Sequence, residues 1–351
     1  MSKLDLTGLT FRLAEYAERE AIIAFINEHF DWRLPLVNRR EFFDYYYCGD
    51  RLQFAVAEAG GRMVAAAGYI LANHSAQPDL WVSVWVAAKG ANGAGLELME
   101  ALPRLTGARV VACNNIRENT CVFYRFLGWT AERVPHYYRL ADRPALADYH
   151  LCRPTIPAGA DPARMPPVRL PAGGDLALDK VSTSVRLYAL GLPAAPHTPA
   201  KDLWYLTRRY FGFPHLAYDV WSVHEKGVLL AYLVTRTVPS GANGQIPVLR
   251  IVDFIGEDSV LPRIGAAVDS LLARTGAEYA DCYCAGIPAS VFAAMGFSER
   301  VPGDGCVIPN YLTPPLYENT EYYYFTNHPE GFVLFKADGD QDRPNLPADE
   351  A

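Results

Sequence analysis

The chain has 351 residues, half of them hydrophobic and a fifth charged, and its formal net charge is −7. The length suits two domains with packed cores, and a negative charge without a block of Lys or Arg argues against a nucleic-acid partner. No apolar run approaches the roughly 18–20 residues of a membrane span. The first residues also lack the apolar stretch of a signal peptide. We therefore expect a cytoplasmic protein that does not insert into membranes.

In chain order, the first half alternates between strand and helix patterns. Strands are predicted at 11–17, 52–58, 62–71, 80–87, 109–113 and 132–140. Helices are predicted at 18–30, 39–47, 96–105 and 120–126. This order predicts an α/β module.

A stretch rich in Pro and Ala, 143–175, separates the two halves and is predicted to be a linker. The second half repeats the pattern more faintly. Helices are predicted at 202–210, 261–275 and 288–295, and strands at 216–223, 228–237, 247–255, 278–284, 322–325 and 332–335. We therefore predict an N-terminal module at 1–142 and a C-terminal module at 176–351.

The seven cysteines are an odd number and are scattered through predicted core segments. Free thiols in a reducing compartment fit this pattern better than disulfides. Cys282 and Cys284 lie two residues apart on a predicted strand, and a metal site there is the less favoured alternative. Asp338, Asp340 and Asp342 have the spacing of calcium ligands, but the glycine near them is not at the position that a calcium-binding loop requires, and the distal Glu of such a loop is absent. We expect no metal and a solvated tail, with a tail folded over a polar ligand as the alternative.

The most informative feature is a strand that runs into a glycine-rich turn and then a helix. The turn contains Gly90, Gly93 and Gly95. Without Cβ atoms, its backbone can approach a ligand closely. The following helix offers unpaired N–H groups and a positive dipole end to an anion. A phosphate or pyrophosphate is the expected ligand, and a purely structural turn is the alternative.

A second motif, Tyr124-x-x-x-Gly128-Trp129, follows on a predicted helix. Together the two motifs resemble the GNAT superfamily of acyl-CoA N-acyltransferases, whose element order the first half also follows. The resemblance implies two tandem modules, each a mixed, mostly antiparallel sheet flanked by helices, with acyl-CoA as the donor substrate. Gly90 replaces the family's usual Arg or Gln, and Ala91 replaces a Gly, which leaves Lys89 as the nearby cation.

By this resemblance, backbone amides of the turn hold the coenzyme A pyrophosphate and the strand before it binds the thioester carbonyl. The donor contacts implied are Trp85, Val86, Ala87, Lys89, Gly90, Asn92, Gly93, Ala94, Gly95 and Asn119. Asn119 lies closer to Tyr124 than the family's Asn does. The second half has a similar helix that ends at Gly296-Phe297. However, Glu257 and Asp258 occupy the positions that correspond to the pyrophosphate-binding turn, and their carboxylates would repel a pyrophosphate. We therefore expect this module to support the acceptor side.

Four residues are candidates for catalysis. The resemblance makes Tyr124 the group that protonates the leaving thiolate, which needs only a weak acid. His74 and Asp79, in the segment before the central strand, are candidates for the base that takes the amine proton, and Ser83 could face the cleft. Each has a structural alternative. Tyr124 could be a tyrosine packed in the core, His74 and Asp79 could belong to a polar turn, and Ser83 could be a hydrogen-bonded serine of the sheet.

The predicted substrate contacts are His136, Tyr138, Arg250, Asp253, Asn310 and Tyr311. His136 and Tyr138 share one strand face. Arg250 and Asp253 lie three apart on an otherwise apolar strand, so we expect them on opposite faces, each with a partner of its own. Either residue could bind a polar ligand, and a structural ion pair is the alternative.

Within the superfamily, the chain most resembles two-module N-acyltransferases of bacterial surface-polysaccharide pathways, such as those of anthrose-like sugars and O-antigen lipopolysaccharide. The segments that carry this likeness include Asp79-Leu-Trp81, Arg250–Gly256, Ile308–Tyr311 and Asp340–Asn345. It implies acyl transfer to the amine of a nucleotide-linked amino sugar. The alternatives are a degenerate module that binds acyl-CoA or a sugar nucleotide without catalysis, and an aminoacyl-tRNA-dependent peptidoglycan transferase, which needs a basic face.

Overall fold

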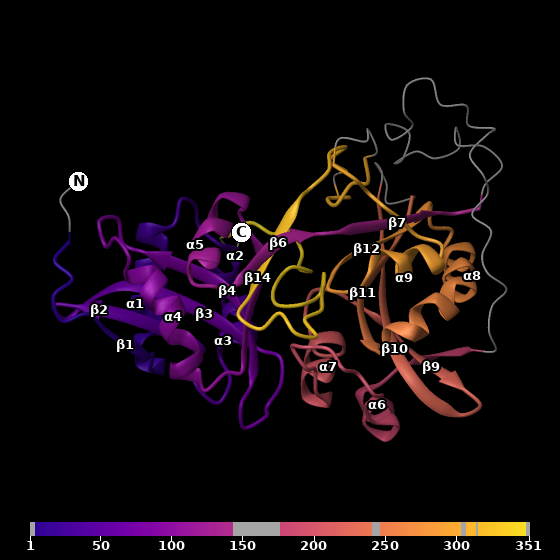
Figure 1. Cartoon of the computed structure of the whole chain (residues 1–351), viewed down its shortest axis with the longest axis horizontal. Coiled ribbons are helices and arrows are strands. Elements are labelled where there is room, and N and C mark those ends of the chain that lie inside the picture. Colours follow the sequence, from indigo (N-terminus) through magenta and orange to yellow (C-terminus); the bar gives the residue numbers. More distant parts are fainter. Residues whose placement is uncertain (1–3, 143–175, 241–245, 303–306, 314, 349–351) are drawn as a thin grey trace.

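The computed structural model describes residues 4–142, 176–240, 246–302, 307–313 and 315–348. The predicted linker at 143–175, Cys152 and Cys306 lie outside these residues, and the other cysteines are free thiols. Two sheets lie next to each other, each with helices on its faces (Figure 1). None of the described helices is long and apolar enough to cross a membrane.

The first sheet has seven strands in the order β1-β2-β3-β4-β5-β14-β6. Their bounds are β1 Thr10–Leu13, β2 Phe54–Ala59, β3 Arg62–Leu71, β4 Asp79–Ala87, β5 Val110–Ile116, β14 Tyr322–Thr326 and β6 Thr130–Val134. All neighbours are antiparallel except β4 and β5. This is the mixed, mostly antiparallel sheet that the resemblance implied.

Helices cover both faces of this sheet. One face packs against α1 Arg19–His29, α2 Pro35–Asn38 and α3 Arg40–Tyr47, preceded by the 3-10 turn η1 Tyr16–Glu18. The other face packs against α4 Ala94–Thr106 and α5 Cys121–Phe126, with the 3-10 turn η2 Glu118–Thr120 before α5. The apolar spacing predicted the positions of α1, α3, α4 and α5 to within a few residues, but it missed the short helix α2.

The second sheet has the strand order β13-β7-β12-β11-β10-β9-β8, and β15 pairs with β12. The bounds are β13 Ser298–Glu299, β7 His136–Leu140, β12 Tyr279–Ala285, β11 Val248–Gly256, β10 Val228–Val238, β9 Asp219–Glu225, β8 Ala177–Val181 and β15 Leu334–Phe335. One face packs on α8 Gly265–Thr275, α9 Ala289–Ala294 and the 3-10 helix η6 Asp258–Ile264. The other packs on α6 Ser184–Leu190 and α7 Leu203–Tyr210. Sequence patterns missed β8 and α6.

The two sheets exchange strands. We expected 132–140 to be one strand of the first module, but it divides at Pro135 into β6 in the first sheet and β7 in the second (Figure 1). Conversely, β14 comes from the second half of the chain and lies between β5 and β6 of the first sheet. Each sheet therefore needs a strand from the other half of the chain.

The parallel strand pair in each sheet is short and then separates. β4 pairs with β5 only from Asp79 to Trp81, and β11 pairs with β12 only from Leu249 to Ile251. In both cases a β-bulge follows at once, because Ser83 in β4 and Val252 in β11 have no partner in the neighbouring antiparallel strand. A bulge bends its strand and increases the local twist. The bulges are therefore consistent with the separation of β4 from β5 and of β11 from β12.

The segment Phe332–Asp342, which we call the buried tail, runs between the two sheets. Its ionisable residues Lys336, Asp338, Asp340 and Asp342 are each at most 5% exposed. The tail enters beside Gly286, which has a φ of +93° and where a Cβ would lie 1.9 Å from the carbonyl oxygen of Phe332. Only glycine fits there. The expected solvated tail is therefore wrong, and the alternative in which the tail folds back agrees with its position.

Candidate functional site

The candidate site lies where β4 and β5 diverge. Beyond Trp81, β4 continues to Ala87 and pairs only with β3, while β5 pairs with β14 on its far edge. The β4 edge that faces β5 is thus without a strand partner among the described residues from Val82 onward. Backbone N–H groups on such an edge can bind a carbonyl oxygen.

The glycine turn and α4 lie at the open end of this divergence. Gly93 caps the 13-residue α4 with a φ of 94°, a conformation that favours glycine. Gly95 packs closely on β4, where the Trp85 indole N–H donates to its carbonyl at 3.0 Å. Ala94 is buried, whereas Lys89, Asn92 and Gly93 are exposed.

This helix start has the geometry of an anion site, because its first N–H groups have no intrahelical partner. Some groups of the turn already have backbone partners. The N–H of Ala94 donates to the carbonyl of Ala91 at 3.2 Å, and the N–H of Leu4 donates to the carbonyl of Gly90 at 3.1 Å. Val86 and Ala87 pair with β3, and Asn119 is exposed in η2, before α5. The predicted donor residues other than Asn119 therefore lie at one end of β4 and in the turn that follows it.

Tyr124, on α5, lies over the same region of the sheet. Its ring stacks 3.9 Å from Phe325 of β14 and lies 5.8 Å from Trp85 of β4. Only 3% of Tyr124 is exposed, and this burial raises the pKa of its hydroxyl well above the usual value. The hydroxyl therefore keeps its proton at neutral pH, which excludes Tyr124 as a base.

Ser83, the bulged residue of β4, lies on the opposite face from Tyr124. Its hydroxyl is 2.6 Å from the hydroxyl of Tyr47 on α3. Tyr47 is fully buried, and this burial raises its pKa far above the usual value. Sequence reasoning missed Tyr47, whose position in an apolar helix pattern gave no functional signal.

The two predicted bases lie at the other end of β4, where the strands are still paired. Asp79 is fully buried and accepts two hydrogen bonds from Arg109, at 3.0 and 2.7 Å, and one from the N–H of Ala200 at 2.7 Å. The His74 ring stacks on Trp204 at 3.7 Å. Asp79 thus joins β4, the start of β5 and the segment before α7, and its geometry favours a structural role.

The buried tail crosses the first sheet on the face that carries Ser83. Asn114 of β5 donates to the carbonyls of Phe335 and Asp338, at 3.0 and 3.4 Å, and Gly339 packs against Trp81. The next acid, Asp340, is buried beside Arg343, and burial raises the pKa of its carboxyl. Burial raises the pKa values of Tyr47 and Cys113, and the charge of Asp340 adds to both shifts. Asp340 is thus a carboxylate near the divergent strands that we did not select from the sequence.

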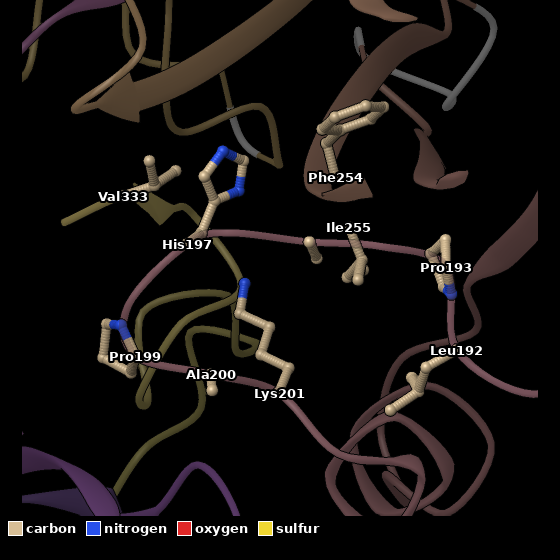
Figure 2. A pocket seen from close by; sticks show the side chains of 10 residues that line it. Leu192, Pro193, His197, Pro199, Ala200, Lys201, Phe254, Ile255 and Val333 are labelled. Carbon is tan, nitrogen blue, oxygen red and sulfur yellow. The ribbon is translucent and has the colours of Figure 1, made fainter. Parts of the chain in front are cut away.

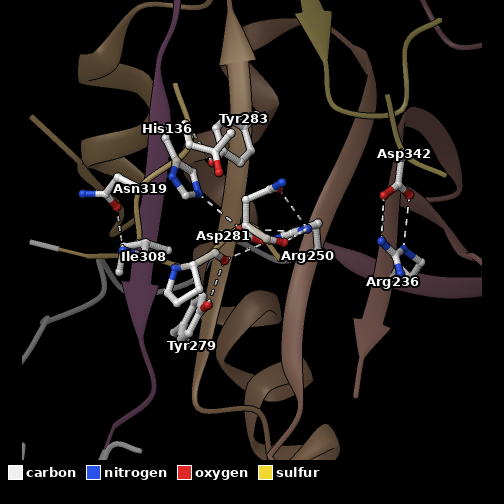
Figure 3. Close-up of polar contacts among 12 residues, drawn as sticks. His136, Arg236, Arg250, Tyr279, Asp281, Tyr283, Ile308, Asn319 and Asp342 are labelled. Atoms are coloured by element: carbon white, nitrogen blue, oxygen red, sulfur yellow. Dashed lines mark hydrogen bonds and ion pairs between the residues drawn. The ribbon is translucent and has the colours of Figure 1, made fainter. Parts of the chain in front are cut away.

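The predicted substrate contacts of the second sheet form a closed cluster instead. Arg250 donates to both oxygens of Asp281, at 2.9 and 2.7 Å, and His136 Nε2 lies 3.2 Å from the same carboxylate (Figure 3). All three side chains are at most 3% exposed. Burial lowers the pKa of His136 to about 4 despite the nearby Asp281, so the imidazole is neutral at pH 7. Arg250 therefore has the structural ion pair that we considered as its alternative.

Arg250 and Asp253 lie on the same face of β11, contrary to our expectation of opposite faces. Leu249, Ile251 and Phe254 all pack in the core with α8, and the bulge at Val252 shifts the alternation by one residue. A one-residue shift moves the following side chains to the other face. Period-two reasoning failed here because a bulge has no reliable sequence signal.

Asp253 belongs to a second buried cluster. It accepts a hydrogen bond from Lys201 at 2.6 Å and another from Tyr210, and Lys201 also contacts Asp338 of the tail at 2.9 Å. Asn310 donates to the hydroxyl of Tyr322 at 2.6 Å. Tyr138 is partly buried, and Tyr311, at 42% exposed, is the most open of the predicted substrate contacts.

No family model matches the sequence, and no curated protein matches it. Among solved structures, a GCN5-related N-acetyltransferase from Anabaena variabilis is similar over 91% of this chain and 72% of its own, with 9% identity and a TM-score of 0.52. The chain has the GNAT fold. A conserved Enterococcus faecalis protein named as a probable N-acyltransferase is similar over 93% and 74%, with 11% identity and a TM-score of 0.51. The predicted fold class is confirmed, and at these identities the similarity concerns the fold alone.

Proposed function

We propose that this protein is an N-acyltransferase that moves an acyl group from acyl-CoA to an amine. The observation that carries the proposal is the arrangement at β4: a bulge at Ser83, an unpaired edge toward β5, and the Gly93 turn at the start of α4. Together these features offer amide donors for a thioester carbonyl and a helix N-terminus for a pyrophosphate.

The proposed roles follow from the two faces of the first sheet. The donor lies on the α4 and α5 face, where Tyr124 is protonated, and the amine approaches from the face of Ser83 and the buried tail. The amine nitrogen attacks the thioester carbonyl carbon, the C–S bond breaks, and the leaving thiolate takes the proton of Tyr124. N–H groups of β4 near Trp85 stabilise the oxyanion. The proton of the amine passes to a carboxylate. Asp340 and Asp79 are each held by an arginine, Arg343 and Arg109. We favour Asp340, because Asp79 lies where β4 and β5 are still paired, away from the point where they diverge.

For the acceptor we propose the amine of a nucleotide-linked amino sugar, as in the surface-polysaccharide enzymes that the sequence resembles. The support is the likeness of the segments around Asp79, Arg250, Asn310 and Asp340 to that branch.

Calorimetric titration with coenzyme A tests the donor site, using the wild type and Gly93→Val. A side chain at Gly93 strains a backbone with positive φ and obstructs the helix start, so we expect the variant to lose detectable binding. Gly107→Val, at the opposite end of α4, is the matched control because that glycine also has a positive φ. Equal affinity of the wild type and Gly93→Val would show that the turn does not bind the donor.

The second step adds a nucleoside diphosphate to the same cell and follows thiol release from acetyl-CoA with amine acceptors. Binding of both ligands supports a ternary complex with a nucleotide-linked acceptor. Binding of coenzyme A alone retains the acyltransferase and rejects the sugar-nucleotide acceptor. Binding without thiol release with any acceptor would favour the non-catalytic alternative.

A further inference from the structure

A cavity of about 520 Å³ lies where the two sheets meet, and we call it the junction cavity. Its volume is in the range of small-molecule sites. One wall comes from Glu132 of β6 and Tyr324 of β14, and the other from His197 and Asp258 of the second half. Phe332, at the start of the buried tail, forms part of its apolar surface. The cavity is therefore built from both sheets.

The junction cavity is separate from the site at β4. It lies at the carboxyl ends of β11 and β12, next to η6 and Gly286. Phe332 lies between it and the first sheet's central strands, with its ring 6.2 Å from Trp81. This location is the second sheet's counterpart of the donor site, but it begins with Glu257 and Asp258 instead of glycines, so an anionic ligand is disfavoured there.

The two carboxylates on the cavity walls are each only partly engaged. Asp258 Oδ1 lies 2.7 Å from His197 Nε2, and its side chain is 37% exposed. Glu132 is exposed, and one of its oxygens accepts from Tyr324 at 3.3 Å. The second oxygen of each carboxylate has no hydrogen bond among the described residues. Each wall can therefore accept a charge-assisted hydrogen bond from a cation.

The lysine of a neighbouring cavity is engaged elsewhere. Lys201 lines a smaller adjoining cavity of about 200 Å³, together with Phe254 and Ile255 of β11 (Figure 2). Its ammonium group is 2.6 Å from Asp253 and 2.9 Å from Asp338, so its charge is already paired. The lining of the junction cavity also includes the apolar residues Pro196, Pro329, Phe332 and Val333.

We propose that the junction cavity binds an aliphatic diamine or polyamine. One ammonium group bonds to Glu132 and the other to Asp258, and the methylene chain lies against the apolar residues of the lining. Such a ligand touches both halves of the chain and so stabilises their association. The inference does not depend on acyl transfer at β4.

The test compares butane-1,4-diamine with butylamine, which has the same chain and one ammonium group. Calorimetric titration of the full chain should show binding of the diamine at least tenfold tighter than of the monoamine. Glu132→Gln and Asp258→Asn should each weaken diamine binding about tenfold, because each removes one charge-assisted contact. Glu20→Gln, on α1 with a side chain 85% exposed, is the matched control and should leave binding unchanged.

Thermal melting of each variant without ligand checks that it folds, and both replaced side chains are partly exposed, so we expect little change. Failure of the wild type to bind the diamine at millimolar concentration would overturn the proposal. Equal affinity for the two amines would overturn it as well, since it requires two carboxylates. Diamine binding that survives in the Glu132→Gln/Asp258→Asn double variant would place the ligand elsewhere and reject the junction cavity. Because donor binding is measured separately with coenzyme A, either proposal can fail alone.

Discussion

Replacement of Asp338 tests the ionic cluster that holds the tail between the sheets. Asp338 is fully buried and shares Lys201 with Asp253, so one ammonium group serves two carboxylates. Burial, against the opposing effect of Lys201, raises the pKa of Asp338 from 3.8 to about 6. Between these values the folded state holds a proton that the unfolded chain has released. The folded state therefore loses stability as the pH rises through this window, by about 3 kcal/mol in all for this one group.

Asp338→Asn removes this titration and keeps an oxygen that can accept from the N–H of Phe335, which lies 2.8 Å from the carboxylate. We therefore expect the difference in unfolding free energy, variant minus wild type, to rise by about 3 kcal/mol between pH 4 and pH 7. Denaturant unfolding followed by tryptophan fluorescence measures this difference at each pH.

Asp342→Asn is the control for the same tail. Contacts with Arg236 hold the pKa of Asp342 at about 2, so its titration window lies below pH 4. The variant should be less stable than the wild type by an amount that does not change between pH 5 and pH 7. A flat difference for Asp338→Asn over pH 4–7 would refute the reasoning, because it would mean that the folded state gives up the Asp338 proton as easily as the unfolded chain does.

Three further substitutions test the first sheet. Tyr124→Phe should lower the maximal rate about tenfold or more and leave coenzyme A affinity nearly unchanged, and wild-type turnover would remove Tyr124 from the mechanism. Asp79→Asn should lower the free energy of unfolding by about 2 kcal/mol, because it weakens a buried ion pair with Arg109. A shifted pH–rate profile in a stably folded variant would instead support Asp79 as the catalytic base. Ser83→Ala removes the contact with Tyr47 and should destabilise the fold by about 1 kcal/mol; a loss of activity beyond tenfold without loss of coenzyme A binding would give the serine a direct role.

Local patterns predicted much of the first sheet. The glycine turn, α4 and the helix carrying Tyr124 were found because each has a short-range signature: glycines with positive φ, apolar spacing, and a Gly-aromatic ending. The position of Asp79 was predicted as well, but not its partner. Arg109 is thirty positions away, and only the parallel pairing of β4 with β5 brings the two together.

The features that sequence patterns missed depend on long-range pairing. The bulges at Ser83 and Val252 change which face a side chain takes, and they leave no mark on the local pattern of apolar residues. The division of one predicted strand at Pro135 depends on two sheets meeting there. The prediction of a solvated tail failed for a different reason. The acidic residues of the tail suggest exposure to solvent, but Arg236 and Lys201 provide the positive charges that allow their burial, and both lie more than a hundred residues earlier in the chain.

These long-range contacts bear on how the two halves function together. The first sheet requires β14, the second requires β7, and the tail crosses both while Arg209 of α7 donates to the carbonyls of Ala337 and Asp342. A hinge between the halves would have to break strand pairing and expose buried charges. The relative position of the two sheets is therefore fixed by the same contacts that stabilise the fold. It follows that the proposed site at β4 and the junction cavity keep a constant geometry to each other. Two segments connect them: the buried tail, and β14, which carries Tyr324 at the cavity and Phe325 against Tyr124.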